Sequence, residues 1–290
     1  MSELTRWQVN LLEARERIFG EEAMGNDFGL MHAVFCHVGL PRSKPPGLTF
    51  QRRSGTASIL IQAGQLYDGE QWVQHGLPYG AKPRLLLMHI AREYKRHRSL
   101  TINLGSGIRD FAMNVLKLDA NGRSLHALRQ QASCLAAAQI RIGYRDHEGN
   151  VHTQLEQPLQ EFVTWDTTDH RSKQMGLFGA QVTITQSFAD ALQQFSVPIN
   201  MVAVSVLKES ALALDIYLWL AHRLRRVGVP TFIPWPALKE QFGQEYRTHK
   251  DFRTTFLNAL RDATTVYPGA RIEVPSGGLT IYPGRAPIPE

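Results

Sequence analysis

The sequence predicts an α+β protein in which one order of helices and strands occurs twice in tandem. Hydrophobic residues make up 43% and charged residues 20% of the 290 positions, a balance typical of a folded, water-soluble chain. From residue 76 onward, apolar residues at helical spacing alternate with short β-branched runs and glycine-rich turns. A chain of this length can bury one large core or two moderate cores, and the repeated order favours two.

Residues 1–75 are predicted to form an extension that packs on the first domain. Apolar residues at helical spacing predict an amphipathic helix over residues 4–19. An apolar run over residues 30–38 ends at a cluster of prolines. Two strands are then expected at residues 48–52 and 57–63, joined by a turn. No candidate site is expected in this extension.

The first domain is expected over residues 76–195. A loop rich in glycine and proline leads to a helix over residues 82–98, and Pro83 suits its first turn because its missing N–H costs nothing there. The loop approaches a phosphate-binding P-loop pattern, but Pro83 follows Lys82 where Ser or Thr is needed, so no nucleotide site is predicted. The elements expected next are a strand at 99–103, helices at 107–116 and 123–138, and a hairpin of strands at 140–145 and 151–156.

The second domain, residues 196–290, repeats this order. Its expected elements are a strand at 202–207, a helix at 209–227, a strand at 231–233, helices at 236–242 and 247–266, and strands at 271–274 and 279–282. Helix, strand, helix, turn, helix and hairpin is the order of the winged helix-turn-helix. We therefore expect two tandem winged-helix domains behind an N-terminal helix and strand extension.

Basic residues gather in two blocks. Residues 104–145 hold six Lys or Arg against two acids, and residues 208–261 hold nine against five, so each block carries a net charge of +4. Between them, residues 146–207 hold seven acids against two basic residues, a net charge of −5. Two basic blocks favour two surfaces that meet one polyanion. The alternative is that the overall charge of +6 only keeps the chain soluble.

The helix over residues 247–266 has one apolar side and one side suited to reading DNA. A rotation of 100° per residue turns four apolar residues inward: Phe252, Phe256, Ala259 and Ala263. The opposite side holds Arg247, Lys250, Thr254, Asn258 and Arg261, with Arg253 beside them. Arginine pairs with guanine edges, asparagine with adenine, and threonine can contact a thymine methyl. These types favour readout in the major groove over an ordinary solvated helix face.

The helix over residues 123–138 is a weaker candidate for the same role. Its buried side is expected to hold Leu125, Leu128, Ala132 and Leu135. Its outer side is expected to show Arg123, Ala127, Gln130, Gln131 and Cys134, flanked by His126 and Arg129. The following hairpin tip carries Asp146 and Glu148, which would repel phosphates. We expect this helix to follow the DNA backbone or to meet a protein partner.

Further phosphate contacts are expected from basic residues at the ends of two other helices. They are Arg92, Lys95 and Arg96 after the loop of the first domain, and Arg223, Arg225 and Arg226 in the second domain. We expect about 6–8 neutralised phosphates in all, which corresponds to a slope of log K against log salt of about −5 to −7.

Patterns typical of enzymes are missing from the sequence. The histidines form no His-hydrophobic-His metal pair of the kind that a nicking initiator needs, and no serine-hydrolase, zinc-protease or dinucleotide pattern occurs. Cys36 and Cys134 stand 98 positions apart and are expected as buried free thiols. Asp166 and Asp169 are expected to be solvated. The sequence therefore predicts a protein that is not an enzyme and has no metal and no cofactor.

The segment from Leu77 to Leu87, Leu-Pro-Tyr-Gly-Ala-Lys-Pro-Arg-Leu-Leu-Leu, resembles the RepA-type family of plasmid replication initiators. Other matching segments are Leu40-Pro41-Arg42, Ala63-Gly64, Leu104-Gly105-Ser106 and Leu212-Ala213-Leu214-Asp215-Ile216-Tyr217. The resemblance covers roughly residues 30–226. The chain departs from the family over residues 113–119, where a compact aromatic or Arg-rich segment is expected.

The resemblance implies an initiator that binds repeated sites, called iterons, in double-stranded DNA at a plasmid origin. It also implies opening of the duplex, recruitment of host initiator and helicase proteins, and a homodimer that can repress its own gene. Together with a polar N-terminus and no long apolar run, it implies a location in the bacterial cytoplasm. Two alternatives stay open, a transcriptional repressor or autorepressor without a replication role and a nicking or primase-like enzyme.

Overall fold

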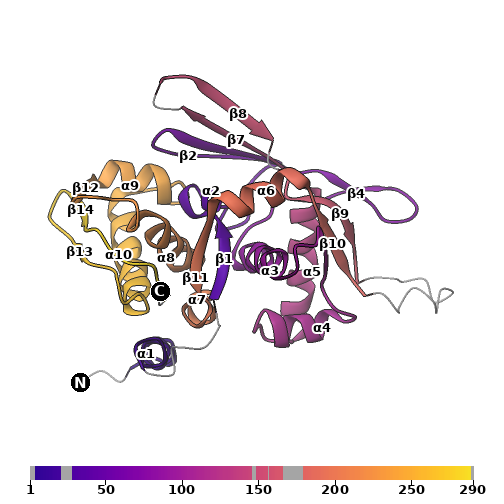
Figure 1. Ribbon diagram of the computed structural model, residues 1–290, viewed down its shortest axis with the longest axis horizontal. Helices are drawn as coiled ribbons and strands as arrows, with labels where there is room; N and C mark the ends of the chain where they lie inside the picture. Colours follow the sequence, from indigo (N-terminus) through magenta and orange to yellow (C-terminus); the bar gives the residue numbers. More distant parts are fainter. Residues whose placement is uncertain (1–3, 21–27, 146–147, 156, 166–178, 289–290) are drawn as a thin grey trace. The chain divides into compact units, whose positions relative to one another are not determined.

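The computed structural model describes residues 4–20, 28–145, 148–155, 157–165 and 179–288 (Figure 1). The chain divides into two compact units, each built from helices and antiparallel strands. Unit 1 comprises Met1–Arg42, Arg52–Gly55 and Ser196–Glu290, and unit 2 comprises Ser43–Gln51 and Thr56–Phe195. No helix of the described residues is long and apolar enough to span a lipid bilayer.

Unit 1 is organised around helix α8 (Ala211–Arg223), which is buried on every side from Leu212 to Ala221. A helix that is apolar all round is typical of the centre of a core. The helices around it are α1 (Arg6–Phe19), α2 (Ala33–His37), α7 (Met201–Leu207), α9 (Trp235–Phe242) and α10 (His249–Thr265). Helices α2, α7 and α10 pack directly on α8.

The N-terminal elements belong to unit 1. Strand β1 (Phe28–His32) pairs antiparallel with β11 (Ser196–Asn200), and the indole Nε1 of Trp7 donates to Asp262 of α10 at 3.2 Å. The helix expected over residues 4–19 is confirmed as α1. However, the sequence prediction placed residues 1–75 against the first domain, whereas the structure groups Met1–Arg42 with Ser196–Glu290. The reason is the β1–β11 pairing, which joins segments about 170 positions apart.

The strand predicted over residues 202–207 is wrong, because this segment is helix α7. The side chain of Asn200 caps the helix by accepting from the backbone N–H groups of Val202 and Ala203 at 2.9 and 3.3 Å. Ala203, Val204 and Leu207 then lie on one buried face. The cap and this burial outweigh the β preference of the valines.

The C-terminal part of unit 1 contains three short strands beside α8, α9 and α10. They are β12 (Thr231–Pro234), β13 (Ile272–Glu273) and β14 (Gly278–Ile281), and β14 lies between the other two. The elements predicted at residues 209–227, 231–233, 236–242, 247–266, 271–274 and 279–282 are confirmed, with ends that differ by up to four residues. Gly278 passes so close to Ile233 that an added Cβ would lie 2.1 Å from its carbonyl oxygen.

Unit 2 begins with two hairpins and a long helix. The first hairpin pairs β2 (Thr49–Ser54) with β3 (Ala57–Gln62), and only the first half of β2 belongs to this unit. The second hairpin pairs β4 (Gln65–Tyr67) with β5 (Trp72–Gln74). Helix α3 (Ala81–His97) follows and buries Leu85–Met88, Ile90, Ala91 and Tyr94. The predicted β2–β3 strand pair and the predicted helix after Gly80 are both confirmed.

The rest of unit 2 contains further helices and two sheets. The helices are α4 (Ile108–Asp110), continued by a π-helical turn (Phe111–Val115), α5 (Gly122–Ala137) and α6 (Gln186–Phe195). The strands are β6 (Thr101–Asn103), β7 (Gln139–Arg145), β8 (Val151–Leu155), β9 (Leu159–Val163) and β10 (Gln181–Ile184). One sheet has the order β6-β10-β9, and the other has the order β2-β3-β7-β8.

The predicted hairpin at residues 140–145 and 151–156 is confirmed as β7–β8, and it belongs to a different sheet from β6. Strand β7 pairs with β3, whereas β6 pairs with β10 (Ile102 opposite Val182). The hairpin that completes the β6 sheet is therefore β9–β10. The β6-β10-β9 order is the same as the β12-β14-β13 order in unit 1, with the last strand in the middle in both.

Candidate nucleic-acid interface

The candidate interface is the helix pair α9–α10 of unit 1. Pro236 lies in the first turn of α9, and Gly243 ends this helix with its N–H on the carbonyl of Lys239 at 2.7 Å. Helix α10 starts at the N-cap Thr248, whose hydroxyl oxygen accepts from the backbone N–H of Asp251 at 3.1 Å. Because the C-cap of α9, Gly243, and the N-cap of α10, Thr248, are only five positions apart, the chain makes a tight turn between the two helices.

The apolar side of α10 anchors it to the core. Phe252, Phe256, Ala259 and Ala263 are all buried, as the helical spacing predicts. The ring centroids of Phe256 and of Phe242 on α9 lie 5.5 Å apart, and the two ring planes are tilted by 52°. Because these rings hold both helices at once, the orientation of the outer side of α10 is determined by the core.

The residues predicted for the outer side of this helix are all exposed, although Arg247 lies before its first residue, His249. Arg247, which directly precedes the cap, and Lys250, Arg253, Thr254, Asn258 and Arg261 are all exposed. Figure 1 shows α10 at the periphery of its unit, beside α8. The predicted orientation of the helix is therefore confirmed, whereas contact with DNA stays a prediction.

Two contacts pre-arrange part of this exposed row. The guanidinium of Arg253 lies over the indole ring of Trp235 at 4.9 Å from the ring centre. Further along the helix, Arg261 Nη2 donates to Asn258 Oδ1 at 2.6 Å. These contacts limit the rotamers of long side chains, so less conformational entropy is lost when they bind a ligand.

A buried ionic cluster holds the turn between α9 and α10. Glu245 accepts from Arg42 Nη2 at 2.5 Å and from Arg52 Nη2 at 2.6 Å. Arg42 Nη1 also lies 3.5 Å from Asp215 Oδ2 on α8, and Arg52 Nη1 donates to the carbonyl of Leu40 at 3.0 Å. The exposed fractions of the Arg42 and Arg52 side chains are only 7% and 1%. Removing one partner from charges at this depth is strongly destabilising, because it leaves the other charge without compensation.

The two guanidiniums change the acidity of Glu245. Burial acts to raise the pKa of this carboxyl, but the positive charges of Arg42 and Arg52 outweigh burial, so the pKa lies below its ordinary value. Glu245 therefore stays ionised and paired at neutral pH. Its contribution to stability is present above the pKa of the unfolded chain and is lost as the pH falls through the lower pKa of the folded state.

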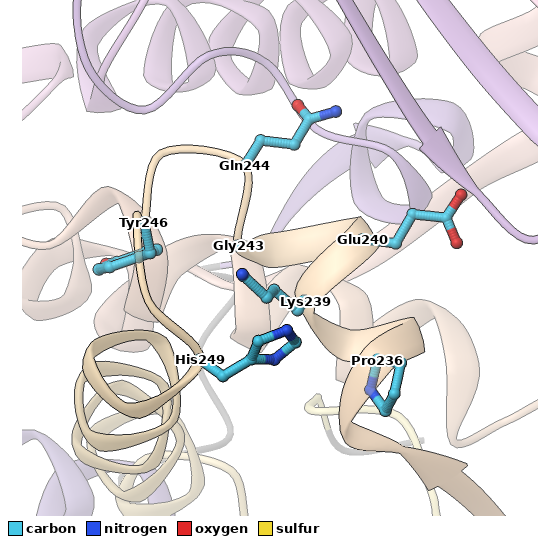
Figure 2. Close-up of a pocket in the computed structure, with 7 residues that line it drawn as sticks. All are labelled: Pro236, Lys239, Glu240, Gly243, Gln244, Tyr246 and His249. Atoms are coloured by element: carbon cyan, nitrogen blue, oxygen red, sulfur yellow. The ribbon is translucent and has the colours of Figure 1, made fainter.

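A shallow depression of about 380 Å³ lies at the turn, beside the N-terminal end of α10. It is lined by Pro236, Lys239, Glu240, Gly243, Gln244, Tyr246 and His249 (Figure 2). Figure 2 shows the side chains of Lys239 and His249 directed toward one another across it, whereas Glu240 points away. Lys239 and His249 were not among the site residues predicted from the sequence. Their positions on either side of a helix–helix turn are the signal that could have identified them.

The basic residues at the end of α8 have partly structural roles. Arg223 is half-buried, and burial lowers the pKa of its guanidinium. Arg226 is exposed but donates to the carbonyl of His222 at 2.8 Å, and Arg225 is exposed. Cations near the C-terminal end of a helix stabilise its unpaired carbonyl groups. Contact of these residues with phosphate stays a prediction.

The remaining predicted site residues lie in unit 2 and form separate surfaces there. On α3, Lys95 and Arg96 are exposed and Arg92 is half-buried, and Arg96 lies 3.7 Å from Glu93. On α5, Arg123, His126 and Gln130 are exposed as predicted. None of these residues shares an element with the α10 row.

Part of the predicted outer side of α5 is wrong, because Gln131 and Cys134 are buried. The side chain of Gln131 accepts from the backbone N–H of Tyr79 at 2.7 Å, so the loop before α3 covers this face. Burial is also the main reason why the pKa of Cys134 lies above its ordinary value. Both cysteines are free and buried, which confirms the prediction for Cys36 and Cys134.

Three acidic residues named in the sequence analysis lie outside the described residues. They are Asp146, Asp166 and Asp169. Glu148, which lies in a turn before β8, is described and exposed.

Solved structures resemble the chain in fold. A crystal structure of selenomethionine derivatives of domains 2 and 3 of RctB superposes with a TM-score of 0.53 at 10% sequence identity, covering 89% of this chain and 99% of that one. A second crystal structure, of RctB domains 2–3, has a TM-score of 0.50 at 11% identity and covers 86% and 94%. At these identities the likeness concerns the fold alone.

Comparison at the level of sequence gives a family. A search of curated proteins finds no significant match. The family model described as plasmid encoded RepA protein, however, matches residues 77–231, which is more than half of the 290 residues. The match includes the segment from Leu77 to Leu87 and helices α3, α5 and α8. The chain therefore belongs to the family of plasmid-encoded RepA proteins.

Proposed function

We propose that this protein initiates plasmid replication by binding repeated sites in double-stranded DNA at an origin. Membership of the RepA family supports the replication role. The observation that carries the DNA-binding part is the exposed row from Arg247, just before α10, to Arg261 on this helix, which follows a tight helix–helix turn. No catalytic step and no cofactor are part of the proposal.

The proposal treats each unit as a winged helix. In unit 1 the elements α8, β12, α9, α10, β13 and β14 follow the winged helix-turn-helix order, and the last strand lies in the middle of the sheet. In unit 2 the corresponding elements are α3, β6, α4, α5, β9 and β10, with β7–β8 as an insertion that pairs with β3. In such folds the second helix of the turn lies in the major groove.

Helix α10 would then supply most of the sequence readout. Arginine donates two hydrogen bonds to the O6 and N7 of guanine, whereas asparagine donates one to the N7 of adenine and accepts one from its N6 amino group. Arg247 and Asn258 have these types, and Thr254 between them can contact a thymine methyl. In the free protein Asn258 already accepts a hydrogen bond from Arg261. To contact a base edge, the two side chains must either break this hydrogen bond or bind the base as a hydrogen-bonded pair.

Phosphate contacts would come from cations around the reading helix and from unit 2. The candidates are Lys239 and His249 at the turn, Arg223, Arg225 and Arg226 after α8, Arg92, Lys95 and Arg96 on α3, and Arg123, His126 and Gln130 on α5. Phosphate contacts fix the register of a protein on the duplex and carry little sequence information. We propose host initiator and helicase proteins as partners, a possible homodimer, and action in the bacterial cytoplasm.

The test is a footprint on the DNA that adjoins the gene of this protein. The proposal expects protection of repeated sites, spaced by about one helical turn or a multiple of it. A footprint without repeats would contradict binding to iterons. A plasmid-maintenance assay then separates the proposal from the alternative of a transcriptional repressor or autorepressor, because an origin that replicates without the protein leaves only repression. Nicking of single-stranded DNA with a divalent metal would instead favour an enzyme.

A further inference from the structure

The β4–β5 hairpin of unit 2 carries two large aromatic side chains in water. Tyr67 and Trp72 are cross-strand partners, with ring centroids 5.7 Å apart and planes tilted by 52°. Their exposed fractions are 58% and 67%. The opposite face of the hairpin holds Leu66 and Val73, which are half-buried, so the aromatic pair is on the outer face. Figure 1 shows this hairpin, at the label β4, extending away from the helices of its unit.

The hairpin is held in shape by hydrogen bonds at both ends. At the tip, Asp68 Oδ1 accepts from the backbone N–H groups of Glu70 and Gln71 at 2.9 and 2.8 Å. At the base, the amide of Gln74 donates to the carbonyl of Gly64 at 2.9 Å. The backbone of Gly64 lies against the end of α5, where an added Cβ would be 2.2 Å from the carbonyl of Ala137. The aromatic pair is thus presented by a rigid support, which lowers the entropy cost of binding.

The charge beside the two rings is negative. Asp68 and Glu70 are both exposed at the tip, and among residues 65–74 they are the only charged side chains. The hydrogen bonds from Gln71 and Glu70 lower the pKa of Asp68, so this carboxylate is ionised at neutral pH. Exposed rings with neighbouring carboxylates attract a cation to the ring faces and repel phosphate. The local charge is thus opposite to that of the whole chain, which is +6.

We propose that the β4–β5 hairpin is a docking site for a cationic, Arg- or Lys-rich segment of a protein partner. Tyr67 and Trp72 receive guanidinium or ammonium groups on their rings, while Asp68 and Glu70 accept hydrogen bonds from the same segment. Single-stranded nucleic acid is the competing ligand for an exposed aromatic pair. The two carboxylates disfavour it, because the backbone of a stacked strand would bring phosphates to the tip.

The direct test measures binding of a fluorescein-labelled octa-arginine peptide to the full chain by fluorescence anisotropy, without DNA. Tyr67→Ala/Trp72→Ala is expected to weaken binding about tenfold, and Asp68→Asn/Glu70→Gln about threefold. The matched control Tyr67→Phe/Trp72→Tyr keeps an aromatic ring at both positions and is expected to lose less than about threefold in binding. Asn at position 68 can still accept the two turn hydrogen bonds, so the hairpin keeps its shape.

Three outcomes would overturn the proposal. The first is that the wild type does not bind the peptide at millimolar concentration. The second is that the alanine variant binds the peptide as tightly as the wild type. The third is that the alanine variant keeps its binding to the peptide but loses binding to a labelled oligo-dT strand. Circular dichroism and the unfolding midpoint of each variant show that it is folded.

The consequence in cells rests on the proposed function. There, Tyr67→Ala/Trp72→Ala is expected to protect origin DNA like the wild type and yet to lose plasmid maintenance. Maintenance at the wild-type level would overturn docking as a step in replication. If the wild type itself gives no footprint, the proposed function fails, whereas the peptide measurement still decides whether the hairpin binds cations.

Discussion

Helices α10 and α5 occupy the same place in the order of their units but present different surfaces. The outer side of α10 is an unbroken exposed row from Lys250 to Arg261, and its apolar side rests on α8 and α9. On helix α5, the exposed residues Arg123, His126 and Gln130 all precede Gln131. In its second half, Gln131 and Cys134 are covered. Helices at the same position in the order of elements can thus present an exposed polar row or a packed face, depending on which parts of the chain cover them.

The two helices are also held differently. The start of α10 depends on a buried ionic cluster around Glu245, with Arg42 and Arg52 as its partners. The cover of α5 depends on a neutral hydrogen bond between Gln131 and the backbone of Tyr79. Removing a buried charge partner costs more than removing a neutral acceptor.

The largest expected effect concerns Arg52. Arg52→Ala is expected to lower the free energy of unfolding by roughly 2–4 kcal/mol, because a partly exposed carboxylate keeps only Arg42 as a cation and the carbonyl of Leu40 loses its donor. Urea denaturation at pH 7 measures this. The matched control is the adjacent, exposed Arg53, whose replacement by Ala is expected to change stability by no more than about 0.5 kcal/mol. Equal losses from the two variants would show that the cluster does not hold the turn.

The next effect compares the two candidate reading surfaces directly. Arg247→Ala and Asn258→Ala are each expected to weaken binding to the footprinted duplex by about 1–3 kcal/mol, because each removes a contact to a base edge. Arg123→Ala and Gln130→Ala on α5 are expected to cost less. All four variants are measured by anisotropy at one fixed salt concentration. Equal or larger losses on α5 would reject the ranking of α10 over α5.

A smaller effect on stability is expected where the loop before α3 packs on α5. Gln131→Ala leaves the N–H of Tyr79 without its acceptor and is expected to lower the free energy of unfolding by about 1–2 kcal/mol. Gln130→Ala, one position away and exposed, is expected to leave stability unchanged within about 0.5 kcal/mol. Thermal unfolding of the pair of variants provides the measurement. Indistinguishable midpoints would mean that water replaces Gln131 and that the loop does not close this face.

The smallest expected effect concerns the salt dependence of binding. With about 6–8 neutralised phosphates, log K is expected to fall against log salt with a slope of about −5 to −7. Arg225→Ala is expected to reduce the steepness by about 1 without changing the preference for one sequence over another. A slope near zero for the wild type would contradict a cationic interface. An unchanged slope in the variant would assign Arg225 to the helix end rather than to phosphate.

Local patterns predicted the elements with strong periodicity well. The spacing of Phe252, Phe256, Ala259 and Ala263 predicts both the helix and the direction of its outer face, because the period of 3.6 residues is a property of the helix itself. The valine-rich run of α7 misled the same reasoning. Its conformation depends on a cap from Asn200 and on burial against other helices, neither of which residue preference contains.

Long-range pairing could not be predicted from the pattern. The sequence contains hairpin signals at β7–β8, but the strand that joins β6 is β10, with Thr183 opposite Thr101. Both hairpins fit β6 by local criteria, since antiparallel pairing makes few demands on residue type. The positions of Gln131 and Cys134 on α5 likewise depend on a loop some 50 residues earlier in the chain.

By itself, the sequence determined the helices with a clear apolar stripe, the exposed row on α10 and membership of the RepA family through residues 77–231. Only the tertiary structure decided that residues 1–42 belong with residues 196–290, which strands complete each sheet, and that Arg42 and Arg52 meet Glu245. Helical faces follow from neighbours three or four positions apart. Sheet partners and buried ion pairs join distant positions, and their energy exists only once the chain has brought those positions together.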